Sequence, residues 1–131
     1  MPSFKKEIQL AKTWYDKWRK RKTYSPALKS NVRISLKAWN HLVGNQGHKK
    51  RSFKDKYRRM KLLKYAEQII TTSTTVQNIT VKHGIKYYAL EAMIEVNISK
   101  NQKEFRKVRV IIYEDKKGDK IFYSVMDKRQ K

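Results

Sequence analysis

The spacing of apolar residues changes once along this chain, at the polar segment "TTSTT" of residues 71–75. Before this segment, apolar residues recur every three or four positions, which is the period of an α-helix. After it, they alternate with polar residues, which is the period of a β-strand. Helices followed by strands with short links are typical of an α+β domain. We therefore expect N-terminal helices packed on a four-stranded antiparallel β-meander.

Three apolar stripes with helical spacing come before this change of period. The first predicts a helix over residues 4–22. The second predicts a helix of about eight residues that follows the extended segment "VRIS" and ends at Gly44. The third predicts a long helix from Ser52, whose apolar stripe is formed by Phe53, Tyr57, Met60, Leu63, Ala66 and Ile70.

Four segments with strand-like composition follow, at residues 75–82, 85–96, 105–113 and 120–127. The last link contains Gly118, which is expected to supply the positive φ of a hairpin turn. Consecutive strands with short links pair antiparallel. The length of 131 residues suits one domain. Within it we expect a basic N-terminal helix and linker at 1–29, a helical part at 30–72 and the antiparallel sheet at 73–127.

The charge of the chain is strongly positive, because 33 Lys and Arg face only 11 Asp and Glu, which gives a net charge of +22. Residues 1–72 hold 20 of these basic residues and only 4 of the acidic ones. Such a charge repels itself, and its usual purpose is to bind a polyanion. Nucleic acid is the expected partner, because neutralised phosphates release counterions and so drive binding. An anionic membrane surface is the second candidate, since the first helix is basic.

Several functional classes are disfavoured by composition. The chain has no cysteine, so it has neither disulfides nor thiolate metal sites, and its three histidines are scattered. No apolar run approaches the roughly 18 to 20 residues that a membrane helix needs. The N-terminus lacks the apolar block of a signal peptide. We therefore expect a protein that acts inside a cell, without a metal or other cofactor.

Strand alternation places chemically active side chains on one face of the predicted sheet. In residues 85–96, Leu90 and its alternate neighbours point toward the helices, whereas Tyr87 and Glu91 occupy the opposite, open face. In residues 105–113, Lys107 and Arg109 occupy that same face. Glu91 and Arg109 are thus expected to lie side by side on neighbouring strands.

The phase of the last strand is ambiguous, because "IFYSVM" is apolar at both parities. If Ile121, Tyr123 and Val125 are buried, Ser124 joins the open face.

This group of residues has two interpretations. One is RNA cleavage without metal, in which a general base takes the 2′-hydroxyl proton and a general acid protonates the leaving 5′-oxygen. Cations then stabilise the charge on the phosphate, and tyrosines stack on a base. The other is a cross-strand ion pair on a solvated face, which contributes only about 0.2–1 kcal/mol. Spacing alone favours the ion pair.

The histidines allow the same two kinds of role. His41 in "AWNHL" stands at the exit of the short helix and precedes a basic loop, so it is either structural or directed at a phosphate. His48 and His83 are expected to be exposed loop residues.

Several short words of the sequence resemble the phage and polymorphic-toxin nucleases of the barnase–EndoU–colicin–RelE group. These words are "VRISLKAWNHLVG", "KKRSFKDKYRRMKLLKYAEQII", "YYALEA", "VRVIIYED" and "KIFYSVMD", and the similarity covers about residues 30–127. In that group helices precede a four-stranded antiparallel sheet that carries the active face. The first helix lies outside the resemblance, and is either an addition or the start of a toxin domain.

The resemblance implies metal-independent RNA cleavage by polar residues that vary between branches of the group. Carried onto this sequence, the word "NHL" points to His41, "FYSVM" points to Ser124, and the sheet points to Glu91 and Arg109 as catalytic residues. RNA and phosphate binding would fall to Arg51 in the basic loop, and to Tyr87 and Lys107 on the sheet. Because no second histidine is placed on the sheet face, a mechanism that pairs Glu91 with His41 is favoured over paired histidines.

The resemblance also implies a partner and a place of action. A cell that makes such a ribonuclease needs protection, so an acidic immunity or antitoxin protein is expected. The enzyme would act on tRNA, rRNA or mRNA in the cytoplasm, either of the producing cell or of a target cell that receives it as the C-terminal part of a larger secreted toxin. A non-catalytic RNA- or DNA-binding protein explains the charge equally well.

Overall fold

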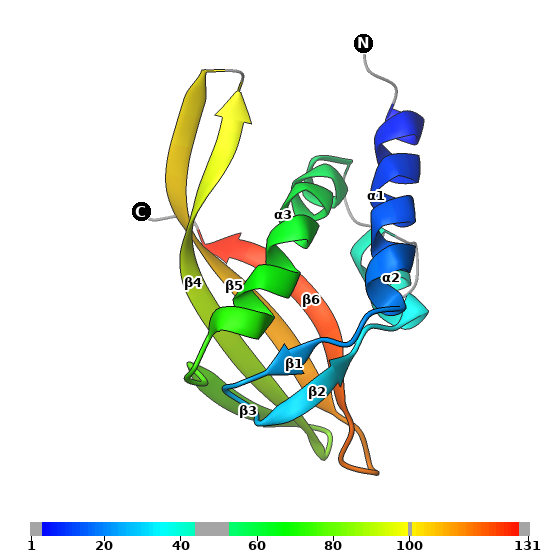
Figure 1. Cartoon of the computed structure of the whole chain (residues 1–131), viewed down its shortest axis with the longest axis vertical. Helices are drawn as coiled ribbons and strands as arrows, with labels where there is room; N and C mark the ends of the chain where they lie inside the picture. The colour runs from blue at the N-terminus through cyan, green and yellow to red at the C-terminus, as the bar shows by residue number, and fades with distance from the viewer. Residues whose placement is uncertain (1–3, 44–52, 100, 129–131) are drawn as a thin grey trace.

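The computed structural model describes residues 4–43, 53–99 and 101–128. In this part of the chain it contains three helices and one six-stranded sheet (Figure 1). The α+β class is therefore confirmed. The elements in chain order are α1 (Phe4–Arg19), β1 (Tyr24–Ser25), β2 (Ser30–Arg33), α2 (Leu36–Val43), α3 (Phe53–Thr72), β3 (Asn78–Lys82), β4 (Ile85–Ser99), β5 (Gln102–Glu114) and β6 (Lys120–Lys128).

The sheet has the order β1-β2-β6-β5-β4-β3, and β2 runs parallel to β6 whereas the other neighbours are antiparallel. The expected four-stranded antiparallel meander is therefore wrong. The helices are also not all N-terminal to the strands, because β1 and β2 precede α2. Both errors come from β1 and β2, which have only two and four residues and are too short to show an alternating pattern.

The four strands expected in the second half are all present, within a few residues of the predicted ends. The exception is the segment 97–104, which was expected to be a link. Because β4 continues to Ser99 and β5 begins at Gln102, most of this segment is strand, and the two strands form a long hairpin that extends beyond the rest of the sheet (Figure 1). Gly118, in the turn between β5 and β6, has the predicted positive φ, at 89°.

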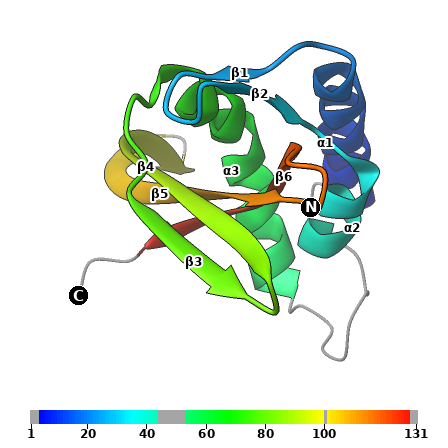
Figure 2. The same cartoon turned by 90° about the horizontal axis from the view of Figure 1, so that it is seen from below.

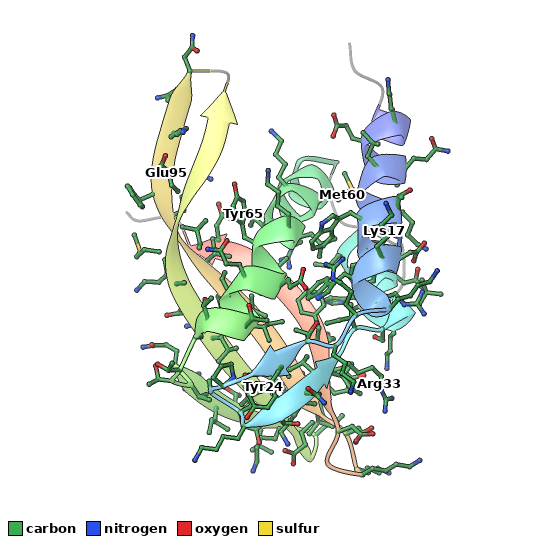
Figure 3. The ribbon with its side chains drawn as sticks, viewed as in Figure 1. Lys17, Tyr24, Arg33, Met60, Tyr65 and Glu95 are labelled. Carbon is green, nitrogen blue, oxygen red and sulfur yellow. The ribbon has the colours of Figure 1, made fainter. Side chains whose placement is uncertain are left out.

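The core lies between the sheet and the helices. Helix α3 lies against the sheet (Figure 2). In the sheet, β1 and β2 are at one edge and β3 is at the other. Val108, Val110 and Ile112 of β5 are fully buried, as alternation predicted. Met60 lies on the side of α3 that faces α1, and Tyr65 lies on the side that faces β4 (Figure 3). One face of the sheet is therefore used for packing.

Helix α1 supplies two of the largest buried side chains, Tyr15 and Trp18. The Trp18 ring centroid lies 5.2 Å from that of Phe122 in β6, and its indole nitrogen donates a hydrogen bond of 2.8 Å to the Thr23 hydroxyl. The Tyr15 ring lies 5.5 Å from Trp39 of α2. Since these side chains fill the same cluster as α2 and β6, α1 is an integral part of the core.

A bulge in β6 explains why its phase was ambiguous. Ile111 of β5 pairs with Ser124 and Ile112 pairs with Phe122, so Tyr123 is an extra residue in β6. Phe122 and Val125 are both fully buried although they stand three positions apart. A single phase that buries Ile121, Tyr123 and Val125 together is therefore wrong, because the bulge resets the alternation in the middle of the strand.

Candidate functional site

The second face of the sheet, opposite the core, carries the chemically active side chains, and we call it the outer face. It is formed by the alternate residues of β4 and β5 that do not enter the core. Tyr87 stands opposite Tyr113 in one row of this face, and Glu91 stands opposite Arg109 in another. Met126 of β6 extends the row of Arg109.

Glu91 and Arg109 form the ion pair that alternation predicted. The Nε atom of Arg109 donates a hydrogen bond of 2.5 Å to Oε2 of Glu91. The Glu91 side chain is only 7% exposed and that of Arg109 is 22% exposed. Their attraction is less screened by water than that of a pair on a solvated face. The interpretation as an ordinary solvated surface pair therefore does not describe this carboxylate.

An aromatic group lies further along the outer face. The His41 ring of α2 stacks on Tyr123, with centroids 4.4 Å apart and planes inclined by 25°. Tyr123 also makes edge contacts with Tyr87 at 5.6 Å and Tyr113 at 5.8 Å. We call Tyr87, Tyr113 and Tyr123 the tyrosine cluster. Because His41 follows the buried Trp39 by two residues, the helical turn directs the two side chains to different sides of α2.

The hydroxyl of Tyr113 stays protonated in this setting. Burial raises the pKa of this phenol, and the nearby carboxylate of Asp115 adds to the increase. At neutral pH Tyr113 can therefore donate a hydrogen bond, which suits contact with a phosphate oxygen.

The two groups of side chains approach one strip of the face from different strands. Glu91 lies on β4 and His41 stacks over β6, with β5 between them in the sheet. Neighbouring strands are roughly 4.8 Å apart, so β4 and β6 are separated by about 10 Å. Tyr87 precedes Glu91 by four residues, which is about 13 Å along β4. Glu91 is level with Met126 of β6, whereas Tyr123, on which His41 stacks, precedes Met126 by three residues, which is roughly 10 Å along the strand.

Ser124 occupies the expected row but is only 2% exposed. Its hydroxyl accepts a hydrogen bond of 2.8 Å from Nη1 of Arg59, and the same nitrogen lies 3.4 Å from the carbonyl oxygen of Val125. Strand β2 pairs with Lys120 and Ile121 at the start of β6. The contact with Arg59 joins α3 to a later part of that strand. The structure thus shows Ser124 holding Arg59, a residue that sequence reasoning missed because "KDKYRRMK" resembles an ordinary solvated helix face.

The remaining predicted residues are distributed differently. Lys107 is exposed on the outer face, opposite Met93. Arg51 lies outside the described residues, as does His48. His83 is exposed in the turn between β3 and β4, as expected, with a φ of 52°.

Within the described ranges, no group of three His, Cys, Asp or Glu is arranged to hold a metal ion. None of the described helices has the length and apolar composition needed to cross a membrane. Comparison with known proteins gives no matching family, no matching curated protein and no matching solved structure for this chain.

Proposed function

We propose that this protein is a metal-independent endoribonuclease of toxin type. The observation that carries the proposal is the nearly enclosed carboxylate of Glu91, held by Arg109 on the outer face, where His41 of α2 stacks on the tyrosine cluster. A carboxylate, a cation and an imidazole are the groups that acid–base cleavage of RNA uses. The net charge of +22 supports a polyanionic substrate.

Each group has a defined role in the proposed reaction. Glu91 removes the proton from a 2′-hydroxyl, whose oxygen attacks the adjacent phosphorus. Arg109 stabilises the negative charge that develops on the phosphate oxygens. His41 protonates the departing 5′-oxygen, so the products are a 2′,3′-cyclic phosphate and a free 5′-hydroxyl. The tyrosine cluster stacks against a base and fixes the strand over β5.

A non-catalytic RNA- or DNA-binding function is the second candidate. It is favoured by one observation, namely that Arg109 already binds the Glu91 carboxylate. In this case the ion pair only stabilises the sheet, while the basic residues of the chain bind phosphates. This function predicts binding that weakens steeply with salt, and no cleavage.

An acidic immunity or antitoxin protein is the proposed partner in the producing cell. Such a protein would cover the basic surface, and complementary charge would speed its capture. Action on RNA in the cytoplasm follows from the proposed substrate.

Incubation of the purified protein with total RNA in EDTA tests the proposed activity. We expect discrete cleavage products with cyclic phosphate ends, because no step needs a metal ion. The His41→Ala variant is expected to cleave at least about 100-fold more slowly than the wild type, since it lacks the general acid. RNA that stays intact with the wild-type protein would leave only the binding function.

Replacing Tyr87 with alanine is expected to weaken binding of a short single-stranded RNA by about 5- to 150-fold, because stacking of one base contributes about 1–3 kcal/mol. Fluorescence anisotropy of a labelled oligonucleotide at fixed salt measures the change. Tyr24→Ala is the matched control, because Tyr24 is an exposed tyrosine on β1, at the end of the sheet away from β4. Equal losses in both variants would show that the tyrosine cluster is not the stacking site.

A further inference from the structure

A second basic site lies away from Glu91, where α1 ends beside β2 and the turn between β5 and β6. It is an open pocket of about 410 Å³. The part of the chain that forms it is strongly basic, and one carboxylate stands among its charged side chains. These side chains are Arg19, Arg21, Lys22, Arg33, Lys120 and Asp119.

Three cations of the pocket, Arg21, Lys22 and Arg33, are available to a ligand. Arg33 donates to Asp119 at 2.8 Å, but the two side chains are 61% and 45% exposed. Arg21 pairs with Glu67 at 2.6 Å, and that arginine is 47% exposed. Such exposed ion pairs stay hydrated and contribute little to stability. A ligand with more negative charge can therefore replace the carboxylate. Lys22 is exposed and pairs with no carboxylate among the described residues.

Arg33 connects this pocket to the outer face. It projects from β2 on the side where α1 ends (Figure 3), and it is in register with Ile121 of β6, which stands opposite Tyr113 of β5. Burial raises the pKa of the Tyr113 phenol, and the positive charge of Arg33 partly opposes this increase. Arg33 is thus close enough to act electrostatically on the tyrosine cluster.

We propose that this pocket binds a backbone phosphate of the RNA whose base stacks on the tyrosine cluster. Arg33 and Lys22 supply the charge, and the carboxylate of Asp119 holds Arg33 in place until a phosphate replaces it. The proposal rests on the proposed RNA substrate. It predicts the path of that RNA over the surface, from β5 across the start of β6 to the end of α1.

Salt-dependent binding tests this site. We expect the double variant Lys22→Ala/Arg33→Ala to bind a short single-stranded RNA about tenfold more weakly at low salt. The slope of log affinity against log salt should fall in magnitude by about 0.7 to 1.4, because one or two phosphate contacts are lost. The matched control is Lys82→Ala/Lys103→Ala, on β3 and at the start of β5. Within the described part of the chain Lys82 pairs with no carboxylate, and Lys103 belongs to an exposed pair. We expect its slope to change less than half as much.

The Asp119→Asn variant gives a test in the opposite direction. It removes the competing charge but keeps the size of the side chain, and the turn is held by the Asp119 backbone, which bonds to Asp115. We expect RNA to bind roughly two- to fivefold more tightly, the factor that corresponds to loss of one exposed ion pair. Weaker or unchanged binding would contradict the role given to Asp119.

Two outcomes would overturn the site without affecting the proposed activity. One is an equal loss of slope in both double variants, which would mean that the charge acts diffusely. The other combines two measurements. Inorganic pyrophosphate shifts the amide NMR signals of Thr23 and Asn31, but the Lys22→Ala/Arg33→Ala variant binds RNA like the wild type. The pocket would then bind phosphate without contributing to RNA binding. Conversely, intact RNA together with the expected difference in slope would overturn the ribonuclease activity and leave the phosphate site supported.

Discussion

Replacing Glu91 with glutamine is expected to lower the rate of RNA cleavage by a factor of about 100 to 10,000, because the general base is lost. Glutamine keeps a side-chain oxygen that can accept the hydrogen bond from Arg109, which the carboxylate accepts at 2.5 Å in the wild type. The measurement is the single-turnover rate of cleavage of a labelled RNA in EDTA. The affinity for that RNA, measured separately, is expected to change much less than the rate.

Glu95→Gln is the matched control for this variant. Glu95 lies on the same strand and the same face, on the long hairpin (Figure 3), and its carboxylate pairs with Lys103 at 3.5 Å. Both partners are well exposed, so we expect wild-type cleavage and nearly wild-type stability. Glu91→Gln removes the negative charge that pairs with Arg109, and this can lower the stability of the fold. Thermal unfolding of both variants therefore separates an effect on catalysis from an effect on folding. A Glu91→Gln protein that is folded and cleaves at the wild-type rate would remove Glu91 from the mechanism.

Replacing Trp18 with alanine is expected to lower the free energy of unfolding by about 3–5 kcal/mol, because a fully buried ring is replaced by a cavity. The Thr23 hydroxyl would also lose the indole donor that bonds to it at 2.8 Å. Small domains are stable by only about 5–15 kcal/mol, so this is a large part of the total. We expect the melting temperature to fall by roughly 10–20 °C, as measured by circular dichroism.

Trp14→Ala is the control on the same helix. The Trp14 ring lies 5.4 Å from that of Trp18, but Trp14 is only half-buried. A smaller cavity forms there, so we expect less than half the loss of stability. If the two variants lost the same small amount, α1 would not be packed into the core in solution, and the first helix would be an addition to a domain that folds without it.

Local periodicity predicted the elements well. The stripes that predicted the three helices and the alternation that predicted β3 to β6 involve residues close together in the sequence. Alternation also predicted the burial of Val108, Val110 and Ile112, and placed Glu91 and Arg109 on the same face of the sheet. In each case the period of one element fixes which side chains share a face.

The features that were missed depend on distant parts of the chain. The pairing of β2 with β6 joins Val32 to Lys120, and no local pattern shows it. The contact of Arg59 with Ser124 likewise joins residues 65 positions apart. The bulge at Tyr123 was invisible because both parities of that strand are apolar.

The sequence by itself determined the α+β class, the positive charge, the positions of three helices and four strands, and the shared face of Glu91 and Arg109. Only the tertiary structure decided that Glu91 is nearly enclosed, that His41 stacks on a cluster of tyrosines, and that the rings of α1 meet Trp39 of α2 and Phe122 of β6. It also assembled the basic pocket beside Arg33. The physical reason is that backbone period is set by neighbours in the chain, whereas burial and the meeting of side chains from separate elements are set by long-range packing.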